Sequence, residues 1–92
     1  MKEYIDRFLE YLSGKKSYNT ILSYKSDIIQ YTDYLKKNNI SSYIKTTKTT
    51  VLSYLLYKQK EGRANSTVSR SLASLRAFYD YLILECNFQM QN

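Results

Sequence analysis

The chain has no histidine, tryptophan or proline among its 92 residues, and it has one cysteine, Cys86, and two glycines. Without histidine, a serine or cysteine nucleophile has no imidazole to activate it. A zinc site needs about four Cys, His or carboxylate ligands at short spacings, and no such group occurs in the sequence. One cysteine cannot form an internal disulfide. We therefore expect no catalytic residues, no metal site and no cofactor in this chain.

Long apolar segments are also missing. No apolar run approaches the ~20 residues that span a membrane, and the first residues begin an amphipathic pattern rather than a signal peptide. These features are typical of a cytoplasmic protein. A chain of 92 residues with 43% apolar side chains can bury one core. The scarcity of helix breakers and the helical spacing of leucine, lysine and serine predict an all-α fold.

Apolar residues at helical spacing predict four helices. The first covers residues 2–12. The second is capped by Ser17 and runs to Lys37, and the third is capped by Thr46 or Thr47 and stops at Glu61-Gly62. The fourth is capped by Asn65 or Ser66 and runs to about Glu85. Gly14 suits the left-handed conformation just past the first helix. We expect residues 1–86 to form one compact four-helix domain, and residues 87–92 to be the start of a linker or a disordered tail.

The apolar stripes of the last three helices define most of the expected core. They comprise Ile21, Tyr24, Ile28, Tyr31 and Leu35, then Val51, Leu52, Leu55 and Leu56, and finally Val68, Leu72, Leu75, Tyr79 and Leu82. The eleven tyrosines are expected to pack in this core or at its edges, as at Tyr54 and Tyr81, rather than to act as nucleophiles or base-stacking platforms. Cys86 is expected to be a small buried hydrophobe.

The net charge of +6 is concentrated in the middle of the chain, with +3 in residues 15–39 and +4 in residues 40–63. Residues 1–14 carry −1. A basic domain attracts polyanions, because each lysine or arginine that neutralises a phosphate releases condensed counterions. Scattered lysines on a solvated surface would produce the same composition, so the charge alone leaves both interpretations open.

Two helix faces opposite the core stripes carry short polar side chains instead of the usual Glu and Lys. The second helix has Asn19, Thr20, Ser23, Lys25 and Ser26 on this side, and the fourth has Ser66, Thr67, Arg70, Ala73, Ser74 and Ala77. Short side chains allow a helix to enter a DNA groove and donate to phosphates or base edges, and helix N-termini add favourable dipoles. The alternatives are that serine and threonine serve there only as helix caps, and that Arg70 forms a surface salt bridge within the bundle.

Two stretches of the sequence can be compared with a known family. Residues 17–27 fit S-x-N-T-x-x-x-Y-x-x-D, and residues 67–82 fit T-x-x-R-x-L-x-x-L-R-x-F-Y-x-Y-L. Together with Val51-Leu52-Ser53-Tyr54-Leu55 and Gly62, they resemble the core-binding domain of tyrosine recombinases, the Xer and phage-integrase family. The resemblance covers nearly the whole chain.

The resemblance implies a four-helix, SAM-like N-terminal domain that forms one half of a C-shaped clamp around double-stranded DNA. It places the second and fourth helices at the major groove, with the candidate DNA contacts Asn19, Thr20, Ser23, Lys25, Thr67, Arg70 and Ser74. The family's catalytic residues lie in a C-terminal domain that this chain lacks, and Asn92 resembles the start of the interdomain linker. The domain would position that catalytic domain for DNA recombination or integration.

Further expectations concern partners. The isolated domain is expected to be a monomer, and the acidic first helix, with Glu3, Asp6 and Glu10, is expected to face away from DNA. The resemblance implies that this helix contacts another recombinase protomer in a synaptic complex, a contact that charge complementarity could guide; the alternative is a plain solvated face. The alternative function is a helical SAM-like protein–protein interaction module, since a fold does not fix a function. DNA binding would weaken steeply with salt, whereas an apolar helix contact would not.

Overall fold

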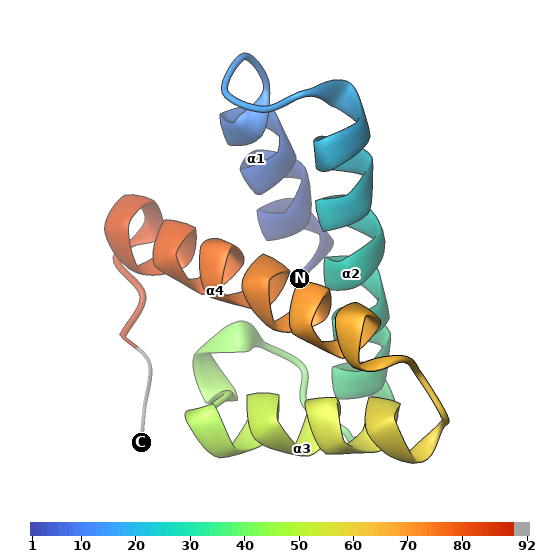
Figure 1. Ribbon diagram of the computed structural model, residues 1–92. Coiled ribbons are helices and arrows are strands. Elements are labelled where there is room, and N and C mark those ends of the chain that lie inside the picture. Colours follow the sequence, from blue (N-terminus) through green and yellow to red (C-terminus); the bar gives the residue numbers. More distant parts are fainter. Residues whose placement is uncertain (90–92) are drawn as a thin grey trace.

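The computed structural model describes residues 1–89, and these form four α-helices, a short 3₁₀ helix and no strands (Figure 1). The elements are α1 (Lys2–Leu12), α2 (Tyr18–Lys37), η1 (Tyr43–Lys45), α3 (Lys48–Lys60) and α4 (Asn65–Cys86). Helices α1 and α2 lie side by side, and α4 contacts α1, α2 and α3. The prediction of an all-α, SAM-like domain is confirmed. Asn92, the residue compared with a linker start, lies outside the described residues.

Local capping explains most of the helix boundaries. The Ser17 hydroxyl accepts a hydrogen bond from the Thr20 N–H at 3.2 Å, and Thr47 forms a reciprocal capping box with Thr50. Gly14 and Gly62 both have φ of +84°, the left-handed conformation that a residue with a Cβ adopts only with strain. The predicted ends of the first three helices are therefore confirmed.

The cap predicted for the fourth helix is wrong. Asn65 and Ser66 are already helical, and the N-cap is Ala64, which has extended backbone angles and no side chain that could accept a hydrogen bond. The first N–H groups of α4 therefore lack a side-chain acceptor from the cap. At the other end the helix continues to Cys86, and Asn87 takes the left-handed C-cap conformation.

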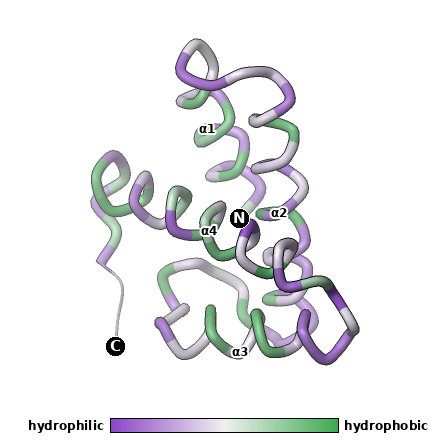
Figure 2. Tube along the Cα trace, viewed as in Figure 1, coloured by the Kyte–Doolittle hydropathy of each residue, from purple (hydrophilic) through white to green (hydrophobic). Residues whose placement is uncertain are grey.

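The buried face of α3 also differs from the predicted one. Leu55 is buried as expected, but Leu52 and Leu56 are 60% and 57% exposed. Tyr54 and Lys58 are buried instead. Figure 2 shows hydrophobic and hydrophilic residues interspersed along this helix. Helix α3 has apolar residues on two sides. The side with Tyr54 and Leu55 faces α2 and α4 and is buried, whereas Leu52 and Leu56 are exposed.

The other helices bury the predicted stripes in large part. Ile28, Tyr31, Leu35, Val68, Leu75, Tyr79 and Leu82 are buried, whereas Ile21, Tyr24 and Leu72 pack partly buried against them. Tyr54 and Tyr81, predicted at stripe edges, are 1% and 8% exposed. Cys86 is partly buried against the core. The aromatic rings meet mainly edge to face, as between Phe8 and Phe78.

Buried hydroxyl groups form two directed chains of hydrogen bonds inside the core. Thr46 donates to the Tyr43 carbonyl at 2.6 Å, so its oxygen is left to accept from Tyr79, which in turn accepts from Tyr31. Thr32 likewise donates to the Ile28 carbonyl at 2.8 Å and accepts from Tyr43. Because each hydroxyl has a single proton, the two carbonyl acceptors fix the direction of both chains.

Candidate nucleic-acid interface

The seven candidate DNA contacts do not all face solvent. Asn19, Lys25 and Arg70 are exposed, and Thr20, Ser23 and Thr67 are partly exposed. Ser74 is 3% exposed, and its hydroxyl donates to Asp27 Oδ2 at 2.6 Å. The prediction that Ser74 lies on the outward face of α4 is therefore wrong. Ser74 lies on the side of α4 that borders α2, and the buried carboxylate of Asp27 accepts the hydrogen bond of its hydroxyl.

The candidates form a strip along α2 and α4 rather than one compact cluster. Asn19 lies eight residues before Asp27 on α2, which corresponds to about 12 Å along the helix axis. Thr20 takes part in the cap of α2, where its hydroxyl accepts from Ser17 at 2.8 Å. Arg70 on α4 meets α2 at Asp27. The strip runs from the beginning of α2 to the crossing of α2 and α4, but it does not include Lys25, which is two residues from Asp27 and therefore lies on the opposite side of α2.

Asp27 is the centre of that crossing. Its carboxylate is 1% exposed and accepts three hydrogen bonds: from Arg70 Nε at 3.2 Å, from Arg70 Nη2 at 2.8 Å and from Ser74. Within residues 1–89 the Asp27–Arg70 contact is the only ion pair. A buried carboxylate is costly unless it is paired and fully hydrogen-bonded, and these donors satisfy it. The hydrogen bonds and charge of Asp27 also raise the pKa of Arg70.

The geometry leaves one edge of the Arg70 guanidinium free. Asp27 occupies the side edge formed by Nε and Nη2, so the end edge formed by Nη1 and Nη2 has N–H groups without a partner among residues 1–89. The Arg70 side chain is 54% exposed, so this end edge is open to a ligand. Asp27 is not among the functional residues predicted from the sequence. The available signal was a carboxylate next to Ile28, at the border of an apolar stripe.

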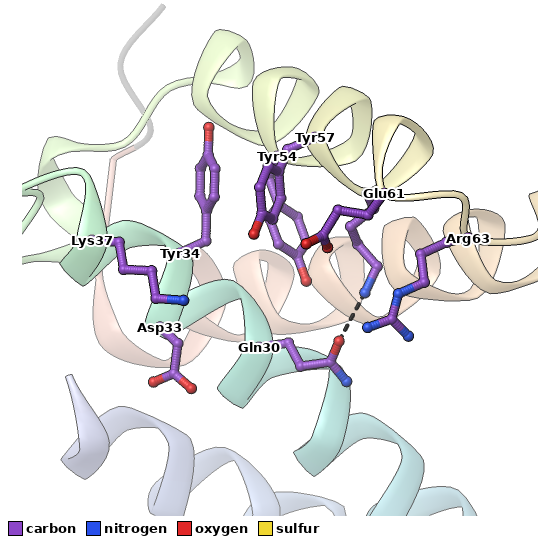
Figure 3. Close-up of a pocket in the computed structure, with 9 residues that line it drawn as sticks. Gln30, Asp33, Tyr34, Lys37, Tyr54, Tyr57, Glu61 and Arg63 are labelled. Carbon is purple, nitrogen blue, oxygen red and sulfur yellow. Dashed lines mark hydrogen bonds between the residues drawn. The ribbon is translucent and has the colours of Figure 1, made fainter.

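A second polar centre lies between α2 and α3 around Lys58 (Figure 3). Lys58 is 3% exposed, and Nζ donates to Gln30 Oε1 at 2.9 Å, the contact dashed in Figure 3. Nζ also lies 5.4 Å from the centre of the Tyr54 ring. Burial lowers the pKa of Lys58, and the neighbouring charge of Arg63 lowers it further. Burial of this lysine was not foreseen from the sequence.

The cavity beside Lys58 has mixed charge. It measures about 200 Å³, and Asp33, Glu61, Lys37 and Arg63 contribute charged groups to its walls. The Tyr54 hydroxyl is buried there without a hydrogen-bond partner among the described residues. Acidic and basic groups oppose each other at short range, so this cavity offers no strong field of one sign.

A larger and more apolar groove of about 490 Å³ lies between α3 and α4. Val51, Leu52, Leu72 and Ile83 line it, with Lys48, Arg76 and Asp80 among the other lining residues. It is distinct from the strip of candidate DNA contacts. In residues 1–89, no group of three or more His, Cys, Asp or Glu side chains could hold a metal ion, and no helix is long and apolar enough to cross a membrane.

Several tyrosine recombinases are similar to this chain over most of its length. XerC of Listeria welshimeri is 35% identical over 81 residues, and XerC of Halalkalibacterium halodurans is 33% identical over 85 residues. These matches cover 86% and 90% of the chain. XerD of Oceanobacillus iheyensis is 33% identical over 89 residues, which cover 92% of the chain. The chain spans 27%, 28% and 30% of the length of these three recombinases, respectively.

No solved structure matches the chain significantly. The family model of the phage integrase N-terminal SAM-like domain matches residues 5–86, from the first turn of α1 to the last residue of α4. This match includes both sequence patterns noted above and the whole Asp27 centre. The chain therefore belongs to the family of phage integrase N-terminal SAM-like domains, and over most of its length it is similar to tyrosine recombinases such as XerC and XerD.

Proposed function

We propose that this chain binds double-stranded DNA as the N-terminal domain of a tyrosine recombinase and positions a separate catalytic domain on the core site. The observation that carries the proposal is that Asn19, Lys25 and Arg70 are exposed on α2 and α4, the two helices that meet at Asp27. The uncapped start of α4 adds backbone N–H groups that can bind phosphate. Family membership supports the same role.

The proposed partners are duplex DNA and, in a full-length recombinase, other protomers of the synaptic complex. Exposed acidic residues on α1, Glu3, Asp6 and Glu10, would repel the DNA backbone, so we place α1 on the side away from DNA. The domain itself cleaves nothing in this proposal, and the strand chemistry belongs to the catalytic domain.

The proposal is tested by titrating a fluorescently labelled duplex with the 92-residue chain at several salt concentrations. With roughly four to six phosphate contacts, the logarithm of the binding constant should fall with the logarithm of salt concentration with a slope of about −4 to −5. Lys25→Ala should weaken binding to every duplex and bring the slope about 0.9 closer to zero. Absence of binding, or binding that salt does not weaken, would overturn the proposal and favour the protein-interaction module.

Lys2→Ala is the matched control for Lys25→Ala. Both lysines are exposed and each variant loses one positive charge, but Lys2 lies on α1. We expect Lys2→Ala to leave the affinity and the salt slope nearly unchanged. Lys58 is unsuitable as a control, because it is buried and its replacement would change the core.

A further inference from the structure

The Asp27–Arg70 pair gives Arg70 a different electrostatic character from Lys25, the one lysine among the candidate DNA contacts. The positive charge of Arg70 is hydrogen-bonded twice to a carboxylate that is 1% exposed. The two charges nearly cancel at the distance of a DNA phosphate. A nearly neutral pair releases few counterions when it approaches DNA, so it adds little to the salt-dependent, sequence-independent part of binding.

The same pair makes Arg70 a rigid double donor. Two hydrogen bonds to a buried group fix the orientation of the planar guanidinium, so little conformational entropy remains to be lost on binding. The free end edge presents parallel N–H groups of Nη1 and Nη2. In the major groove, guanine offers two neighbouring acceptors, O6 and N7, that match such a fork. Adenine has a donor at one of these places, and cytosine offers a donor in place of the acceptors.

The neighbours of Arg70 on α4 permit a close approach to base edges. Ser66 precedes it by four residues, Ser69 is adjacent and Ala73 follows by three, and all three are exposed. None of them has a side chain long enough to hold the helix away from a groove. Arg70 is therefore the longest side chain among these four residues of α4, and its guanidinium is anchored to Asp27 on α2.

We propose that Arg70 is a specificity-determining residue that reads a guanine in the major groove through its Nη1–Nη2 edge, and that Asp27 is the positioning residue that holds this edge outward. This inference rests on the proposed function, since it needs a domain that binds duplex DNA. It goes further by assigning base recognition to one side chain and phosphate attraction to others.

The test selects duplexes bound by the 92-residue chain from a pool with random sequence, and then measures affinities for the selected site. We expect enrichment of guanine at one position. Replacing that guanine with adenine should weaken binding by the unaltered chain roughly 5–150-fold, and 7-deazaguanine, which lacks the N7 acceptor, should weaken it in the same direction. These two measurements need no protein variant, so they are independent of any folding defect.

Two variants separate base reading from phosphate binding. Arg70→Ala combined with Asp27→Asn removes both charges of the pair, so this double variant should lose the guanine preference and keep the salt slope of the unaltered chain. Asp27→Asn should also lose the preference, but it frees the Arg70 charge, so its slope should become more negative by about 0.9. Circular dichroism is measured for each variant to check that it is folded.

Other results would overturn the inference. If no guanine is enriched, Arg70 does not read a guanine. If the double variant Arg70→Ala with Asp27→Asn weakens all duplexes equally and brings the slope about 0.9 closer to zero, Arg70 is a phosphate contact. The proposed function would stand in both cases, provided that the chain binds duplex DNA in a salt-dependent manner. If it binds no duplex at all, the proposed function itself fails.

Discussion

The hydroxyl of Tyr31 on α2 lies 2.6 Å from the hydroxyl of Tyr79 on α4, although 48 residues separate the two tyrosines in sequence. Both side chains are buried, and Tyr79 donates onward to Thr46 at 2.6 Å. This chain of hydroxyls joins α2, α4 and the segment before α3. Burial raises the pKa of Tyr31 and of Tyr79 above the ordinary value of 10.0, so both hydroxyls hold their protons more tightly than a solvated tyrosine does.

The buried tyrosines predict a loss of stability at alkaline pH. Burial raises the pKa of Tyr43 from 10.0 to about 12, so this tyrosine binds its proton more tightly in the folded state. Its contribution is fully present below pH 10 and is lost as the pH rises to about 12. The shift corresponds to about 3 kcal/mol for Tyr43. Urea unfolding between pH 8 and 12 measures the loss.

Two phenylalanine variants check that the loss comes from burial. Tyr43→Phe removes one hydroxyl whose pKa is raised by burial, so the free energy of unfolding of this variant should fall less between pH 10 and 12 than that of the unaltered chain. Tyr18 is 75% exposed, and Tyr18→Phe should leave the pH profile unchanged. Equal profiles for Tyr43→Phe and the unaltered chain would contradict the prediction.

The Asp27 centre predicts coupled effects on stability. Arg70→Ala should destabilise the chain by about 1–3 kcal/mol, less than the 3–5 kcal/mol typical of a fully buried pair because Arg70 is half exposed. Ser74→Ala should cost about 1–2 kcal/mol. Because both donate to one carboxylate, the double variant should deviate from additivity by about 0.5 kcal/mol or more. Urea unfolding of the four proteins gives the coupling.

A control for these variants lies on the same helix. Arg76 is exposed and has no ion pair among residues 1–89, so Arg76→Ala should change the free energy of unfolding by no more than about 0.5 kcal/mol. Additive effects of Arg70→Ala and Ser74→Ala would show that Asp27 does not couple them.

Removing the charge of Lys58 should stabilise the chain. Lys58→Met keeps a long apolar side chain and removes a buried cation whose partner is the Gln30 amide, so we expect a gain of roughly 1 kcal/mol at pH 7. The folded-state pKa of Lys58 is lowered from 10.5, so the gain should shrink as the pH rises through that lowered pKa toward 10.5, and it should vanish above 10.5, where the lysine is neutral in both states.

Unfolding curves at pH 7 and pH 10 measure this effect, with Lys60→Met as the exposed counterpart on α3. Lys60→Met should change stability by no more than about 0.5 kcal/mol. A loss of stability in Lys58→Met at pH 7 would mean that the Gln30 hydrogen bond outweighs the cost of burying the charge.

The acidic face of α1 predicts an effect on assembly. In a full-length recombinase that contains this chain, Asp6→Lys combined with Glu10→Lys should weaken synapsis, because it reverses the charge of the surface proposed to meet another protomer. Gel mobility of synaptic complexes measures the change. Affinity for a single site should not fall, and unchanged synapsis would refute the contact.

The helices themselves follow from the sequence because their signals are local. Ser17, Thr47 and Gly62 act on backbone groups within a few residues, so their effect does not depend on the rest of the fold. Ala64 shows the limit of this reasoning. Asn65 and Ser66 could each act as a cap, but the helix begins at Asn65, so Ala64 is the N-cap and no side chain accepts a hydrogen bond there.

The candidate site was predicted only in part from the sequence. The periodicity of α4 placed Arg70 outward correctly, but periodicity describes one helix at a time. Ser74 is only four residues further along, and the crossing with α2 covers it. DNA contact by the exposed candidates stays a prediction until it is measured.

The sequence by itself determined the four helices, the amphipathic stripes of α1, α2 and α4, and the family, since these depend on spacing and short motifs. Only the tertiary structure decided which side of α3 is buried, that Lys58 enters the core, and that Asp27 holds Arg70 across 43 residues of chain. The physical reason is that such contacts depend on how the helices cross. Burial of a charge is tolerated only where another element supplies its partner, and the pattern within one helix contains no information about that partner.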